Sequence, residues 1–207
     1  MVLPSMTLKF WCKRTDSALH EPACSTICIL QKMILRLDAG ALVAASGSET
    51  ILPDDTTPLL GSRLAEIGGK LIRETLPKLL SGNFNQTEQN ETEATYCRII
   101  KKEDGHIRWQ EESAIEIERK LRAFTPWPGI FGFYSTVDNS GKKRRIQFTK
   151  VEIENGNFEP GKVYPDLIVG TLSGALRILR LKPEGKQEMD ADSFLRGQPQ
   201  IVGTILE

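Results

Sequence analysis

The segment at residues 83–95, NFNQTEQNETEAT, limits what this chain can fold into, because it contains almost no hydrophobic side chain. A segment of this composition cannot run through a core, so it either links two units or lies on the surface of one. The sequence therefore predicts a domain over residues 1–82, a linker over residues 83–104 and a second domain over residues 105–207.

The first domain is predicted to be α/β. Residues 25–37, STICILQKMILRL, form a nearly continuous apolar run typical of a buried strand. Residues 38–51 open with a turn and continue as a second extended segment. Residues 52–82 carry Leu60, Leu64, Ile67 and Leu71 at helical spacing, which predicts a helix.

The ends of this helix also have sequence signals. Thr57 is expected to cap its start, with Pro58 at the first helical position. Pro77 is expected to kink or restart the helix, and Gly82 to end it.

The second domain is predicted to open with a short helix and a stiff corner. Ser113 and Glu116 form a capping-box pattern, and the helix should end near Phe124 because the residue before Pro126 avoids helical geometry. The sequence TPWPG follows, and we expect its tryptophan, Trp127, to pack beneath the β structure after it. Large aromatic side chains are more often buried anchors than ligand platforms.

A series of short strands follows the corner. Residues 130–137 and 144–153 are predicted to pair as a hairpin through the turn DNSGKK, with a bulge in the second strand. The stretches GKVYP, LIVGT and ALRILRLK continue at the spacing of a small barrel. A helix at 190–197, capped by Asp190, and a final strand QIVGTIL complete the expected domain.

Composition excludes few classes of function. Lys plus Arg and Asp plus Glu number 27 each, and no apolar run reaches the roughly 18 residues that a membrane span needs. The N-terminus lacks the pattern of a secretory signal, and four cysteines in a chain this long do not form a disulfide framework, so we expect a cytoplasmic protein with reduced thiols.

Neither histidine shows a strong site pattern. His20, Cys24 and Cys28 are spaced by four residues and would share a helical face suited to zinc. Cys28 falls in a strand-like run, however, and no fourth ligand is near, so we expect no metal. His106 is expected to be an exposed turn residue.

Several stretches resemble the methionyl-tRNA formyltransferase family. They are RAFTPWPG at 122–129, ATYCRIIKKEDGHIRW at 94–109, LKPEGKQEMDADSFLRG at 181–197, ICILQKMILRLDAGALV at 27–43 and RLAEIGGKLIRETLPKLLSG at 63–82. The resemblance covers roughly residues 27–207, and residues 1–26 fit the family poorly.

The resemblance implies a remnant of a Rossmann-like α/β catalytic domain followed by an OB-like β-barrel that binds tRNA. It implies transfer of a formyl group from 10-formyltetrahydrofolate to the amino group of initiator Met-tRNA. Asp38 falls on the catalytic aspartate of the family. The catalytic asparagine and histidine, in an Asn-X-His-Gly-Ser-Leu-Leu-Pro element, have no match here and would lie upstream of Met1.

From these implications we expect a truncated catalytic domain that lacks most of the folate site, a monomeric protein and little or no transfer by the chain as given, since a carboxylate without its partners stabilises a transition state poorly. Two alternatives remain: a tRNA-binding module without chemistry, and an inactive fragment of the enzyme.

The densest basic segment, GKKRRIQFTK, is either a solvated hairpin or a phosphate-binding patch. The resemblance to a tRNA-binding domain favours the second interpretation. The predicted tRNA-binding residues are Lys142, Lys143, Arg144, Arg145 and Lys150, and Arg177, Arg180 and Lys182 could extend the surface.

Overall fold

The computed structural model describes residues 6–13, 25–94, 96–135 and 143–207, which fall into two compact units. Unit 1 extends to Arg98 and unit 2 begins at Ile99. No helix in the described ranges is long and apolar enough to cross a membrane.

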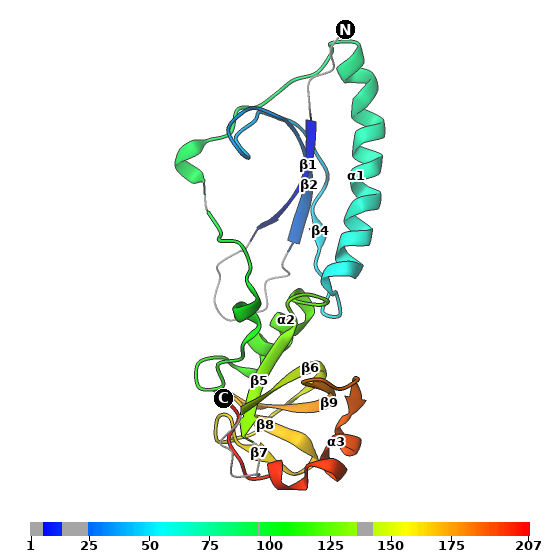
Figure 1. The fold of residues 1–207 in the computed structure, drawn as a ribbon. Coiled ribbons are helices and arrows are strands. Elements are labelled where there is room, and N and C mark those ends of the chain that lie inside the picture. The colour runs from blue at the N-terminus through cyan, green and yellow to red at the C-terminus, as the bar shows by residue number, and fades with distance from the viewer. Residues whose placement is uncertain (1–5, 14–24, 95, 136–142) are drawn as a thin grey trace. The chain divides into compact units, whose positions relative to one another are not determined.

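Unit 1 consists of one antiparallel sheet and a long helix (Figure 1). Its elements are β1 (Met6–Lys13), β2 (Ser25–Lys32), β3 (Leu42–Ala45), β4 (Glu49–Thr50), α1 (Thr57–Leu80) and the short helix η1 (Glu91–Glu93). The strand β2 is central and pairs with the other three. Every pairing among the described strands of unit 1 is antiparallel, so this part of the chain does not show the parallel sheet of a Rossmann-like domain.

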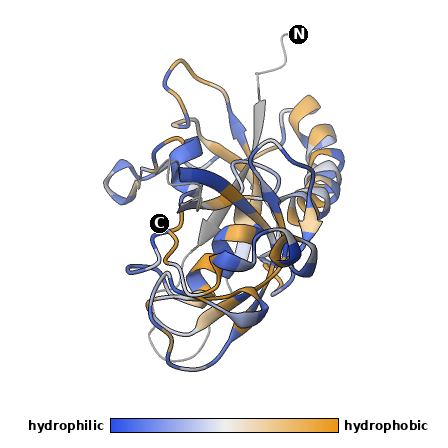
Figure 2. Cartoon of the chain, turned by 60° about the horizontal axis from the view of Figure 1, so that its bottom comes forward, coloured by the Kyte–Doolittle hydropathy of each residue, from blue (hydrophilic) through white to orange (hydrophobic). Residues whose placement is uncertain are grey.

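Hydrophobic and hydrophilic residues are interspersed along α1 (Figure 2), and its buried residues are Leu64, Gly68 and Thr75. Leu64 is buried, and its carbonyl oxygen accepts a hydrogen bond from the Cys28 thiol of β2 at 3.4 Å. The expected cap at Thr57 is wrong, because Thr56 is the N-cap residue and its side chain makes no capping hydrogen bond. The helix continues through Pro77 to Leu80, and Gly82 follows with φ of 74°.

The polar segment that follows α1 is hydrogen-bonded to the rest of unit 1. Backbone hydrogen bonds of 2.8 Å in both directions join Leu42 of β3 to Thr87. Gln89 donates through its side-chain nitrogen to the carbonyl oxygens of Asp38, at 2.9 Å, and Gly40, at 2.7 Å. The segment therefore lies along the edge strand β3, and the Gln89 amide satisfies two carbonyl oxygens of the turn around Asp38.

Unit 2 begins with two short helices and continues as a six-stranded sheet. Its elements are η2 (Lys102–Gly105), α2 (Ala114–Ala123), β5 (Ile130–Ser135), β6 (Lys143–Glu154), β7 (Val163–Tyr164), η3 (Pro165–Leu167), β8 (Ile168–Gly170), β9 (Ala175–Pro183), β10 (Met189–Asp190), α3 (Ala191–Gly197) and η4 (Pro199–Ile201).

Local signals predicted most of these elements. Ser113 and Glu116 form the expected capping box, and α2 ends at the expected position with Phe124 as its C-cap residue. The bulge in β6 is confirmed by register shifts between Phe148 and Val151, and Asp190 caps α3 by accepting a hydrogen bond from the Ser193 backbone nitrogen. The predicted hairpin turn lies largely outside the described residues.

The strand ladder runs in the order β5-β6-β9-β8-β7 and does not pair back on itself among the described residues, so the expected closed OB-like barrel is not confirmed. The expected final strand QIVGTIL is wrong: the chain forms η4 and then an extended tail. This tail bonds to both outer strands, since Glu207 exchanges two backbone hydrogen bonds with Phe133 of β5 and Gly203 donates to Val163 of β7.

Candidate nucleic-acid interface

The strand β6 carries the basic segment that the sequence singled out (Figure 1). Lys143, Arg144 and Lys150 have exposed side chains, and Arg145 is half-buried. Lys142 and the rest of the turn lie outside the described residues. The bulge after Phe148 changes the alternation of the strand, so Val151 takes the core-facing position and Lys150 is exposed to solvent.

Arg145 is held against the sheet. Its guanidinium carbon lies 3.9 Å from the centroid of the Phe131 ring, and its backbone nitrogen donates to a Glu184 carboxylate oxygen at 3.3 Å. The Arg145 Nε atom is buried without a hydrogen-bond partner. Stacking on an aromatic face fixes the direction of a guanidinium, so the two terminal nitrogen atoms of Arg145 are the ones left to bind a ligand.

Lys143 forms an ion pair with the side chain of Glu207 in the C-terminal tail. Both side chains are more than half exposed, and pairs of this kind contribute little to stability because water and salt screen them. A phosphate group would compete with Glu207 for this lysine.

The basic surface continues onto β9. Lys150 lies opposite Arg180 in the ladder, and Lys182 lies opposite Gln147. The Arg180 Nε atom donates to Glu188 at 3.2 Å, and Thr149 donates to the same carboxylate at 2.6 Å. The Thr149 hydroxyl and the Arg180 charge together lower the pKa of Glu188. Arg180 is thus partly neutralised, whereas Lys150 and Lys182 are exposed.

His106 is not the exposed turn residue that the sequence predicted. It is half-buried, and its ring lies 5.5 Å from both Phe131 and Phe133, stacked on the first and edge-on to the second. Its Nε2 atom is buried without a partner. The parallel bridge between His106 and Phe131 places the ring there, a tertiary contact with no local sequence signal.

Trp127 is also placed differently from the prediction. It is 60% exposed rather than packed beneath the sheet. The buried tryptophan of unit 2 is Trp109, which is 1% exposed and packs edge-on against Phe148 at 5.8 Å. The TPWPG corner thus leaves its aromatic side chain largely open to solvent, and Trp109 rather than Trp127 fills the core.

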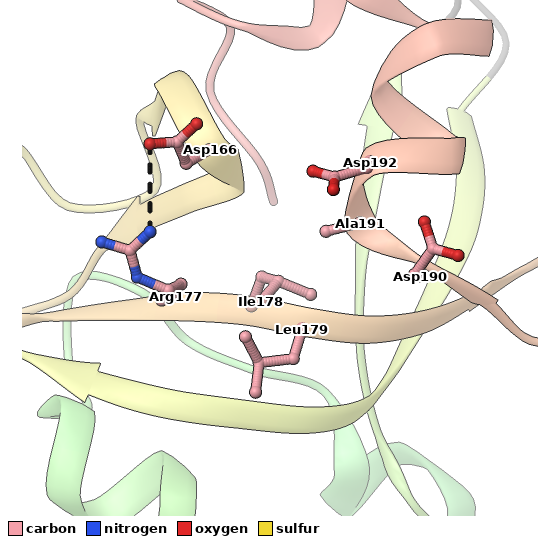
Figure 3. A pocket seen from close by; sticks show the side chains of 7 residues that line it. All are labelled: Asp166, Arg177, Ile178, Leu179, Asp190, Ala191 and Asp192. Carbon is pink, nitrogen blue, oxygen red and sulfur yellow. Dashed lines mark ion pairs between the residues drawn. The ribbon is translucent and has the colours of Figure 1, made fainter.

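A pocket of about 260 Å³ lies beside β9, between Asp166 and the start of α3 (Figure 3). Arg177 pairs across it with Asp166 at 3.9 Å, and binds Glu154 more closely at 2.6 Å. Asp190 and Asp192 extend from the start of α3 on the opposite wall. A pocket lined by three aspartates disfavours phosphate, so it does not extend the basic surface.

Asp38, the predicted catalytic residue, lies in an exposed turn of unit 1 with φ of 62°. The described part of unit 1 contains no histidine and does not assemble the Asn-His-Asp set that the resemblance implies. The described residues of unit 1 do not fit a folate site. Cys28 is buried, which raises its pKa, and the described residues form no metal cluster; His20 and Cys24 lie outside them.

The chain is similar to known formyl transferases in sequence and in fold. Residues 99–199 match the formyl transferase C-terminal domain family. A methionyl-tRNA formyltransferase of Dehalococcoides mccartyi is 38% identical over 180 residues, covering 86% of this chain and 55% of that protein. One of Macrococcus caseolyticus is 34% identical, covering 83% of this chain and 54% of that protein.

Solved structures agree at the level of fold. HypX from Aquifex aeolicus matches with a TM-score of 0.60 and 17% identity, over 86% of this chain and 31% of HypX. An N-formyltransferase from Helicobacter canadensis matches with a TM-score of 0.53 and 13% identity, over 80% of this chain and 56% of that one.

Sequence and fold together place the chain among relatives of the formyl transferases, and residues 99–199 match the C-terminal domain of that family. Among these relatives are methionyl-tRNA formyltransferases, as the sequence resemblance predicted. The chain spans about 55% of the length of these relatives.

Proposed function

We propose that the protein serves formyl transfer from 10-formyltetrahydrofolate to the amino group of initiator Met-tRNA, and that unit 2 is an OB-like domain that binds the tRNA. The observation that carries the proposal is the similarity to methionyl-tRNA formyltransferases over 86% of the chain. A solved HypX in complex with tetrahydrofolic acid shares the fold with a TM-score of 0.58, which is consistent with a folate donor.

In this proposal the phosphates of the tRNA contact the basic side chains of β6. Lys143, Arg144 and Lys150 are exposed on a single strand, and phosphate contacts of this kind act by releasing counterions rather than by reading bases. Arg145, fixed on Phe131, would hold a phosphate in one direction. Asp38 is the candidate residue for the chemical step on the resemblance of its turn alone, because the described part of unit 1 brings no histidine to it.

The test of tRNA binding is a gel shift of the whole chain with initiator tRNA over a range of salt concentrations. The triple variant Lys143→Ala, Arg144→Ala, Lys150→Ala should bind roughly tenfold more weakly and reduce the salt slope by about 3, one for each lost phosphate contact.

A matched control removes the same charge from elsewhere in unit 2. Arg108, Arg119 and Arg196 are exposed residues outside the β strands, and their triple alanine variant should keep most of the affinity. Equal losses in the two variants would show that net charge alone, and not the β6 surface, governs binding.

A second candidate function, a tRNA-binding module without chemistry, is favoured by the exposed setting of Asp38. Formylation of Met-tRNA by the chain that falls when Asp38 becomes Asn would reject it. Binding without any formylation would support it.

A further inference from the structure

Trp127 is the exposed aromatic side chain that most needs explanation in unit 2. It lies between Pro126 and Pro128, and 60% of it is open to solvent. Pro128 and Gly129, directly after it, are buried. The backbone of this corner is therefore anchored in the protein while the indole ring points away from the core.

Contacts on both sides hold the corner in place. The Thr125 hydroxyl donates to the Leu121 carbonyl oxygen at 2.7 Å, and the Gly129 nitrogen donates to the Phe124 carbonyl oxygen at 2.9 Å. A Cβ on Gly129, where φ is 71°, would lie 2.3 Å from the Gln147 side chain. The ring is thus presented by a rigid backbone, so a ligand that stacks on it pays little conformational entropy.

Two lysines of the sheet lie near the corner in the strand ladder. Ile130 is the first residue of β5 and pairs with Phe148 of β6. The corner just before Ile130 therefore lies next to the part of β6 that continues to Lys150. Lys182 is the ladder partner of Gln147, which contacts Gly129. The short helix η2, which comes before α2 in the chain, also contacts the corner. A Cβ added to its Gly105 would lie only 2.1 Å from the Gly129 oxygen.

That helix adds charges of both signs. Its first residue, Lys102, is exposed, and so is Lys101 before it. The Asp104 carboxylate accepts a hydrogen bond from the Lys101 backbone nitrogen at 2.7 Å, and Glu103 is exposed. The corner therefore has lysines near it from β6, β9 and the start of η2, together with the carboxylates of Glu103 and Asp104.

We propose that Trp127 stacks on an unpaired base of the bound RNA while Lys150 and Lys182 contact the phosphates beside it. This inference rests on the proposed tRNA-binding function and adds base stacking to it. Exposed aromatic rings bordered by cations are the usual platform for single-stranded nucleic acid, because every base has a stacking face. An apolar protein partner would instead favour a wider hydrophobic surface without lysines.

The first experiment compares two RNAs of equal phosphate number, an oligouridine and a blunt duplex, by fluorescence anisotropy with the whole chain. Trp127→Ala should weaken oligouridine binding by about tenfold, as expected for one lost stacking contact. Trp127→Phe should fall in between. Neither variant should change duplex binding more than about twofold, since phosphates dominate there.

Leu172→Ala is the matched control, because Leu172 is a large apolar residue of unit 2 with a similar exposure of 57%. It should bind both RNAs like the parent chain. Tryptophan emission gives an independent readout: oligouridine should quench the parent and the control, and the quenching should be lost in Trp127→Phe.

The outcomes separate the two proposals. If the β6 triple variant weakens binding but Trp127→Ala does not, stacking is rejected and the proposed function stands. If the β6 triple variant has no effect, the proposed function fails. Equal losses of Trp127→Ala on both RNAs would indicate a disturbed fold rather than a stacked base and would also overturn the inference.

Discussion

At the scale of single residues, Asp55 connects the start of α1 to the strands before it. Its carboxylate is 4% exposed and accepts two hydrogen bonds from the Arg63 guanidinium, at 2.8 and 2.6 Å, and one from the Leu52 backbone nitrogen at 2.7 Å. Arg63 also binds Glu49 of β4 at 2.6 Å. These carboxylates raise the pKa of Arg63, so the guanidinium stays charged. A buried carboxylate depends on such donors because it has lost its hydration.

Replacing Arg63 by Met should therefore loosen the N-terminal half of α1. Backbone hydrogen exchange measured by mass spectrometry should accelerate there by roughly tenfold, the effect of leaving a buried carboxylate with fewer donors. Arg73→Met, on an exposed position of the same helix, is the control. Similar exchange in both variants would mean that the Asp55 contacts do not stabilise unit 1.

At the scale of elements, α2 is set by its capping box. Glu116 accepts a hydrogen bond from the Ser113 backbone nitrogen at 2.8 Å and another from the Ser113 hydroxyl at 2.8 Å. The backbone bond first, and the hydroxyl second, lower the pKa of Glu116 below its ordinary value near 4.5. The ionised form is thus favoured in the folded state.

A group whose pKa is lowered by folding stabilises the fold above its unfolded pKa, and this contribution is lost as the pH falls through the folded value. Glu116→Gln keeps an acceptor at the same position but does not titrate. In urea unfolding, the parent chain should exceed this variant in stability at pH 7, and the difference should shrink as the pH falls below about 4.5. A difference that is constant with pH would reject the assignment.

Features set by neighbouring residues were predicted from the sequence, whereas features set by distant contacts were not. The capping box at Ser113, the bulge after Phe148 and the end of α2 before Pro126 were predicted correctly, because each is decided by neighbours within a few residues. Trp127, His106 and the C-terminal tail were predicted wrongly, because each depends on a distant partner. The basic residues of β6 were found as a pattern, but the stacking of Arg145 on Phe131 has no signal along the chain.

At the scale of the whole molecule, the C-terminal tail connects the two outer strands of an otherwise open sheet. Leu206 is 2% exposed and donates its backbone nitrogen to the Gly161 oxygen at 2.8 Å. The next residue, Glu207, bonds to Phe133 of β5. The sheet of unit 2 is therefore covered along both edges by a segment without regular strand structure, and this protects edges that would otherwise pair with other chains.

Because the core around Leu206 consists of residues of unit 2 alone, a defect there should affect one unit selectively. Leu206→Ala should lower the free energy of unfolding of unit 2 by about 2–4 kcal/mol, the usual result of truncating a buried leucine. Hydrogen exchange should rise at Phe133 and along β7, while the peptides of α1 stay as protected as in the parent. Ile205→Ala, in the same tail but 53% exposed, should change neither. Loss of protection in α1 on Leu206→Ala would show that the two units unfold as one, and that the tail stabilises the whole chain rather than unit 2 alone.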